Sequence, residues 1–196
     1  MEQIRAFVAI ELNRELLNRL TQLQERLQRQ APPRSVRWVG PEGIHLTLQF
    51  LGDIPASRVA EISRALETAS RDVGPFAFQV HGLGCFPNVR RARVVWVGVE
   101  EATGALQRLQ KSVGRQLAAL GYPPEARPFS PHLTLGRVQR SASWSDQQQL
   151  GELITNSQVE TLGRMTADAV FLKRSDLRPT GAVYSTLARL PLGADR

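Results

Sequence analysis

The sequence predicts an α+β protein built from two similar lobes that are related by a pseudo-twofold axis. The tetrapeptide His-Leu-Thr-Leu begins at His45 and occurs again at His132, in a chain of 196 residues with only three histidines. The order strand, long helix, proline-containing break and motif strand describes residues 5–51 and fits residues 93–138 as well. This approximate internal repeat indicates two copies of one unit, with the two motif strands facing each other at the centre.

A parallel, doubly wound sheet is the alternative architecture, because helices alternate with strands along much of the chain. Two observations argue against it. No glycine-rich phosphate-binding loop follows a strand, and the second half of the chain places its strands in adjacent pairs. We therefore favour the two-lobed arrangement.

The individual elements follow from the spacing of apolar residues. Leucines at helical spacing from Leu16 to Leu27 predict a first helix, which Pro32 and Pro33 end. Short apolar or alternating runs predict strands, and a turn at 178–181 separates the last two. The predicted strands are 5–11, 36–39, 44–51, 76–86, 93–99, 131–138, 164–172 and 183–190, and the predicted helices are 13–30, 57–70, 103–120 and 144–155.

Length and composition suit one domain over residues 1–196. A hydrophobic content of 42% is enough for an ordinary core. No stretch approaches the roughly 20 apolar residues of a membrane span, and the first ten residues do not resemble a signal peptide. Cys85 is the single cysteine, so an intrachain disulfide is impossible. We expect a cytoplasmic protein that does not associate with membranes and is a monomer.

The charge is strongly positive, at +7, with an isoelectric point of about 10.8. Lys111 and Lys173 are the only lysines, so almost all of the 25 cationic residues are arginines. Arginine suits bidentate contacts with phosphate and stacking on bases, which favours a nucleic-acid or nucleotide partner. A general bias of the composition toward arginine is the alternative explanation.

The two motifs are the strongest indication of function. Residues i and i+2 of a strand point to the same side, so each motif presents an imidazole beside a hydroxyl and hides two leucines behind them. A single motif of this kind is usually no more than a pair of polar side chains that face the solvent, but packing does not explain why the rare histidine repeats in the same register. Because histidine titrates near neutral pH, one ring can accept a proton while the other donates one.

Longer blocks around the motifs resemble the two-histidine phosphoesterase superfamily, and within it the RNA 2′,3′-cyclic phosphodiesterase family, first described as 2′-5′ RNA ligase. The resemblance covers nearly the whole chain. Five blocks carry it, in chain order. They are the opening strand at 5–10, the first motif block at 38–39 with 44–53, a middle strand at 94–99, the second motif block at 127–137 and a closing strand at 184–187.

This resemblance implies a bilobal α+β fold with outer helices and an active cleft between two antiparallel sheets. It implies hydrolysis of a terminal ribose 2′,3′-cyclic phosphate of RNA or a nucleotide to a 2′-phosphate, and in some members reversible 2′-5′ ligation. No metal and no other cofactor is needed. A zinc site would require three or four converging ligands, and His81 with Cys85 lacks a second pair.

The chemistry assigns roles to the four motif residues. One histidine serves as base for water and the other as acid for the departing ribose oxygen, and we take His45 as proton donor and His132 as proton acceptor, although pseudo-symmetry makes these roles exchangeable. Thr47 and Thr134 can donate hydrogen bonds to the phosphoryl oxygens.

Phe50 and Arg137 each stand five residues after a motif histidine. The resemblance suggests that they sandwich the terminal base, through ring and guanidinium stacking. Strict alternation would place both on the side opposite the histidines, so a bulge or strand end must turn them. Core packing of Phe50 and a solvated charge at Arg137 are the alternatives.

Two other functions remain open from the sequence. One is a 2′-5′ phosphodiesterase that cleaves linear oligonucleotides, and the other is a non-enzymatic RNA-binding or nucleotide-binding module of the same fold. Retention of both motif histidines argues against the binding module, because binding alone needs no pair of proton donor and acceptor.

Overall fold

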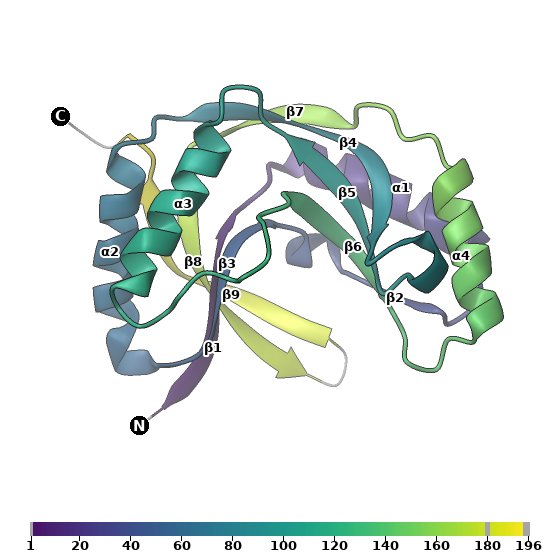
Figure 1. Ribbon diagram of the computed structural model, residues 1–196, viewed down its shortest axis with the longest axis horizontal. Coiled ribbons are helices and arrows are strands. Elements are labelled where there is room, and N and C mark those ends of the chain that lie inside the picture. The colour runs from purple at the N-terminus through teal and green to yellow at the C-terminus, as the bar shows by residue number, and fades with distance from the viewer. Residues whose placement is uncertain (1, 179–180, 194–196) are drawn as a thin grey trace.

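A long antiparallel sheet forms the centre of the computed structural model, which describes residues 2–178 and 181–193. Its strand order is β7-β4-β5-β6-β3-β1-β8-β9, and β2 pairs with β6 beside this path (Figure 1). The strands are β1 (Gln3–Ile10), β2 (Val36–Trp38), β3 (Leu46–Pro55), β4 (Phe76–Phe86), β5 (Val94–Glu100), β6 (His132–Val138), β7 (Gly163–Ala167), β8 (Ala169–Arg178) and β9 (Gly181–Pro191).

The sheet has two halves that meet where β3 and β6 touch. Only one residue pair, Leu46 with Leu133, joins these two strands in the antiparallel register. One half contains β7, β4, β5, β6 and β2, and the other contains β3, β1, β8 and β9. The expected bilobal α+β architecture is therefore confirmed, with the two motif strands at its centre.

Within the described residues, four α-helices pack on the sheet, and the two halves exchange helices (Figure 1). α2 (Val59–Arg71) packs on α3 (Ala105–Ala118), and this pair contacts β3, β8 and β9. α1 (Arg14–Gln30) contacts β7, and α4 (Trp144–Asn156) contacts β4. Thus α1 follows β1 but covers the other half, while α3 follows β5 and crosses in the opposite direction.

Helix termini have the caps that their sequences provide. The side chain of Asn13 accepts a hydrogen bond from the Leu16 amide (2.8 Å), which begins α1. Ser143 and Asp146 form a reciprocal capping box at the start of α4. None of the helices in the described part of the chain is long and apolar enough to cross a lipid bilayer.

The single strand predicted at 164–172 is wrong, because the chain forms two strands there. β7 pairs with β4 in one half, and β8 pairs with β1 in the other. Asp168 lies at the break, where its carbonyl accepts a hydrogen bond from the Leu192 amide (2.8 Å) and its carboxylate pairs with Arg189 (2.8 Å). An apolar run carries no signal for such a crossing between halves. In the predicted turn at 178–181, Pro179 and Thr180 lie outside the described residues.

The two sides of the sheet differ in burial. On β5, Val95, Val97 and Val99 are buried, whereas Val94, Trp96 and Gly98 are only half-buried. The same alternation places Leu46 and Leu133 in the core, both fully buried. The opposite side of the sheet is therefore the more accessible one at its centre, and this side carries the polar residues of the two motifs.

Candidate active site

The β3–β6 register brings the two motifs together. Because Leu46 lies opposite Leu133 in an antiparallel pair, one step along each chain sets His45 opposite Thr134, and Thr47 opposite His132. The two leucines point into the core, so their polar neighbours point to the other side of the sheet. We call this side, which carries His45, Thr47, His132 and Thr134, the site face.

His45 lies immediately before the first residue of β3, although the strand predicted at 44–51 included it. Its ring stacks on Phe7 of β1, with ring centroids 4.6 Å apart, and meets the Tyr184 ring edge-on at 5.2 Å. Phe7 is only 2% exposed, so the imidazole packs on an aromatic ring that the core holds in place. These contacts hold the ring in place beside Thr47.

A buried lysine lies close to this histidine. Lys173 of β8 is 8% exposed and forms an ion pair with Glu11 and a hydrogen bond with the Thr186 hydroxyl (3.0 Å). The pKa of His45 is lowered to about 4, mainly by burial and in addition by the charges of Lys173 and Arg137, while Glu11 opposes this shift. His45 is consequently neutral at neutral pH in the unliganded protein.

We expect this lowered pKa to weaken the fold at acid pH. Unfolding returns His45 from a pKa of about 4 to its ordinary 6.5, so between these values the unfolded chain binds the extra proton. This proton uptake has little effect above pH 6.5, where the unfolded chain no longer holds the extra proton. At pH 5 it reduces the free energy of unfolding by about 2 kcal/mol. Urea unfolding at pH 7 and pH 5 measures it as the difference between the protein and His45→Asn. Equal losses in both proteins would contradict the lowered pKa.

His132 is oriented differently, by the backbone. It begins β6, and its Nδ1 atom lies 2.7 Å from the carbonyl oxygen of Ser130. A carbonyl only accepts hydrogen bonds, so Nδ1 carries the hydrogen and Nε2 is the proton-accepting nitrogen of the neutral ring. Its ring meets the Phe86 ring edge-on, with centroids 4.9 Å apart, and the centroid of the Trp96 ring lies 6.4 Å away.

A bulge in β3 brings Phe50 to the site face. In the pairing with β1, Thr47 lies opposite Ala9 and Phe50 opposite Phe7, so Leu48 is an extra residue in β3. Because Phe7 and Ala9 point to the same side of β1, Phe50 points to the side of Thr47. Its ring is 49% exposed and lies 5.9 Å from the Phe7 ring, which disfavours the alternative of core packing.

The second motif has a bulge at the equivalent place. In the pairing with β5, Thr134 lies opposite Trp96 and Arg137 opposite Val94, which leaves Leu135 as the extra residue. Arg137 thereby joins the site face, as Phe50 does. The carbonyl of Leu135 accepts hydrogen bonds from the buried Gln24 side chain (2.7 Å) and the Val39 amide (2.8 Å), so the irregular backbone stays paired.

Three residues near His45 were missed by the sequence analysis: Phe7, Glu11 and Lys173. Their positions follow from β1–β3 and β1–β8 pairing, in which Lys173 lies opposite Phe7. A possible signal was Lys173 itself, one of two lysines in the chain and placed in an apolar strand. Glu11 directly follows β1 and had no comparable signal.

The side chains of the site face do not suit a metal ion. Near the two histidines they are hydroxyl, aromatic and basic groups and one carboxylate, that of Glu11, which is paired with Lys173. Divalent cations need several carboxylate, thiolate or imidazole ligands that converge. Within residues 2–178 and 181–193, no three His, Cys, Asp or Glu side chains form a potential metal site. The third histidine, His81, contacts Glu100 instead (3.1 Å).

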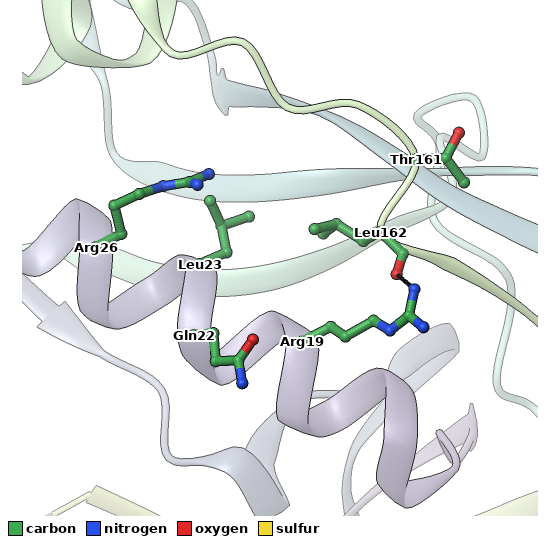
Figure 2. Close-up of a pocket in the computed structure, with 6 residues that line it drawn as sticks. All are labelled: Arg19, Gln22, Leu23, Arg26, Thr161 and Leu162. Carbon is green, nitrogen blue, oxygen red and sulfur yellow. Dashed lines mark hydrogen bonds between the residues drawn. The ribbon is translucent and has the colours of Figure 1, made fainter.

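A cavity of about 350 Å³ lies on the opposite, helix-covered side of the sheet. Figure 2 shows it between α1 and the segment before β7, with Arg19 donating a hydrogen bond to the Leu162 carbonyl (2.8 Å). It contains none of the six residues that the sequence analysis selected. The candidate site thus rests on strand register and contacts, and this cavity is separate from it.

Paired His-x-Thr motifs on one face of a two-lobed sheet define a phosphoesterase of the two-histidine class. A family model described as LigT-like phosphoesterase matches the chain twice, at residues 10–96 and 97–184. The chain therefore belongs to the LigT-like phosphoesterase family, as the sequence resemblance predicted.

Individual relatives agree with this assignment over almost their whole length. An RNA 2′,3′-cyclic phosphodiesterase of Methanothermobacter thermautotrophicus is 35% identical, over 94% of this chain and 97% of its own. A crystal structure from Thermus thermophilus has a TM-score of 0.79 at 28% identity, covering 98% of this chain and 100% of that one. Escherichia coli LigT, crystallised with 3′-AMP, has a TM-score of 0.73 at 25% identity, covering 97% and 99%.

Proposed function

We propose that this protein hydrolyses a terminal ribose 2′,3′-cyclic phosphate, on RNA or on a nucleotide, to a 2′-phosphate end. The observation that carries the proposal is the cross-strand arrangement of His45, Thr134, Thr47 and His132 around Leu46 and Leu133. It provides two imidazoles and two hydroxyls on one face, which is what displacement at phosphorus requires. The curated relatives named RNA 2′,3′-cyclic phosphodiesterase support the same activity.

The reaction needs one proton removed and one supplied. Water attacks phosphorus in line with the 3′-oxygen, His132 takes a proton from the water, and the bond from phosphorus to the 3′-oxygen breaks. The departing 3′-oxygen receives a proton from His45, which leaves a 3′-hydroxyl and a 2′-phosphate. The Nδ1 contact of His132 with Ser130 supports its role as base, because it makes Nε2 the accepting atom.

The role of His45 as acid requires a proton that the unliganded protein does not hold at neutral pH. A pKa of about 4 keeps the ring neutral until substrate arrives. The negative charge of the bound phosphate raises the pKa of a neighbouring histidine, so His45 acquires its proton in the complex. Ligand binding is then coupled to proton uptake, and the affinity for a phosphate ester rises as pH falls.

The remaining residues of the site face fit the substrate. Thr47 and Thr134 donate hydrogen bonds to the non-bridging phosphoryl oxygens, on which charge grows in the transition state. The bulges turn Phe50 and Arg137 to the same face, where they can stack on the two sides of the terminal base.

The continuous sheet supports one two-lobed domain, while cytoplasmic location and the monomeric state stay predictions.

We expect full activity in EDTA, because the histidines and threonines supply what a metal would otherwise do. Nucleoside 2′,3′-cyclic monophosphates are incubated with the protein with and without EDTA, and phosphorus NMR identifies the product isomer. The expected result is an unchanged rate and a 2′-phosphate. Loss of activity that a divalent ion restores would contradict the metal-independent mechanism. A 3′-phosphate product would mean that the 2′-oxygen, and not the 3′-oxygen, is the leaving group.

The same assay separates the alternative functions. A binding module would bind cyclic phosphates without turnover, and a 2′-5′ phosphodiesterase would cleave linear 2′-5′ oligonucleotides faster than cyclic ends. Ligation uses the same displacement, with an RNA 5′-hydroxyl in place of water. Adding RNA with a 5′-hydroxyl end to the cyclic substrate therefore tests ligation directly, through a new 2′-5′ linkage.

A further inference from the structure

Two arginines form a like-charged pair at the edge of the site face. Arg37 of β2 lies directly opposite Arg137 in the antiparallel β2–β6 register. Residues paired in this way point to the same side of a sheet, and the bulge after Thr134 sets Arg137 on the site face. Arg37 therefore also points to this face, and both side chains are exposed.

This pair is electrostatically unfavourable in the protein alone. Like charges directly opposite each other on neighbouring strands destabilise a sheet. In the described part of the chain, no carboxylate forms an ion pair with Arg37 or Arg137, whereas Arg19 and Arg58 each have one carboxylate partner and Arg174 has two. Two guanidinium groups without a protein anion are suited to bind an external phosphate.

The pair lies close to the motif residues. β3 pairs with β6 in register only at Leu133, and β2 takes its place beside residues 136–138. With Leu135 bulged out, Arg137 stands about two strand residues beyond Thr134, a distance of roughly 7 Å. A phosphate held between the two motifs would thus have Arg37 within one nucleotide's length.

We propose that Arg37 binds the internucleotide phosphate on the 5′ side of the terminal nucleotide. This inference rests on the proposed function and narrows its substrate to RNA ends of at least two nucleotides. The terminal cyclic phosphate occupies the motifs, the terminal base lies by Arg137, and the next phosphate of the chain neutralises the arginine pair. A mononucleotide lacks that phosphate and leaves the pair uncompensated.

Arg37 could instead serve the sheet alone, because charged residues on edge strands discourage pairing with other chains. That explanation predicts no dependence of substrate preference on Arg37. The two explanations therefore differ in one measurable quantity, the preference for a dinucleotide over a mononucleotide.

The experiment compares three substrates: adenosine 2′,3′-cyclic phosphate, the dinucleotide ApA ending in the same cyclic phosphate, and that dinucleotide with a neutral methylphosphonate linkage. We expect the protein to prefer the charged dinucleotide by about tenfold in kcat/KM, the size of one charge-assisted contact. The methylphosphonate should abolish this preference, and rising salt should reduce it. Arg37→Gln should lose the preference and respond little to the methylphosphonate.

The matched control is Arg29→Gln, which removes the same charge from an exposed position in the last turn of α1. It should keep the preference of the unmodified protein. The inference is wrong if Arg37→Gln also keeps the preference for the charged dinucleotide. It is also wrong if the methylphosphonate linkage lowers kcat/KM as much for Arg37→Gln as for the unmodified protein. If no substrate is hydrolysed, the proposed function fails instead, and calorimetric affinities for the 2′-phosphate dinucleotide, with and without the charged linkage, still decide the role of Arg37.

Discussion

Replacing either His45 or His132 by glutamine should lower kcat/KM on a 2′,3′-cyclic phosphate by about a hundredfold or more, the usual weight of general acid–base catalysis. Glutamine keeps a polar side chain but cannot transfer a proton near neutral pH. The two rings lie on one face of the sheet, each beside the threonine of the opposite motif, so we expect both to act on the same phosphate. Loss of one ring blocks a step that the other cannot complete.

The double variant should be little worse than either single variant, because the two histidines work as one unit. His81→Gln is the matched control. His81 contacts Glu100 on the β4–β5 pair and has no assigned role in the reaction, so its replacement should leave the rate unchanged. Losses in log rate that add in the double variant, or a rate profile without a bell-shaped dependence on pH, would contradict paired proton transfer.

Much of the site was accessible from the sequence because strand geometry is periodic. The repeat of a rare histidine in the same tetrapeptide predicted two equivalent strands, and alternation predicted which residues share a face. The structure adds the register: Leu46 faces Leu133, which crosses the motifs so that each histidine neighbours the other motif's threonine. No local pattern encodes that register, because it depends on how two distant strands dock.

The sequence predicted that the alternation of the motif strands must break, but not where or by which irregularity. Phe50 and Arg137 required some break in alternation, and the structure has a one-residue bulge at the same place in each motif. The bulge residue Leu135 is stabilised by Gln24, which comes from a helix that follows a strand of the other half. Such support comes from tertiary packing, as do the crossing at Asp168 and the approach of Lys173 to His45, so single-sequence periodicity cannot show it.

Removing a threonine hydroxyl should have the second-largest effect on the reaction. Thr47→Val and Thr134→Val keep the branched shape that packs on the site face but remove a hydrogen-bond donor. Among the hydrogen bonds of the described residues, none uses either hydroxyl, so these groups are available for a ligand. Removing one preorganised donor from an oxyanion site costs roughly 100- to 1000-fold, and we expect about 10- to 100-fold for one of two partly exposed donors.

The loss should fall mainly on kcat, because charge on the phosphoryl oxygens is greatest in the transition state. Steady-state kinetics on a cyclic mononucleotide separates kcat from KM for each variant. Thr47→Ser and Thr134→Ser are the matched controls, since serine keeps the hydroxyl and should restore most of the rate. Urea unfolding should show that the valine variants keep their stability, because no intramolecular hydrogen bond is broken. A valine variant with normal kcat and raised KM would mean that its threonine only binds the ground state. Equal losses in the serine and valine variants would contradict the proposed role, because serine keeps the hydroxyl and the loss could then not be attributed to a missing donor.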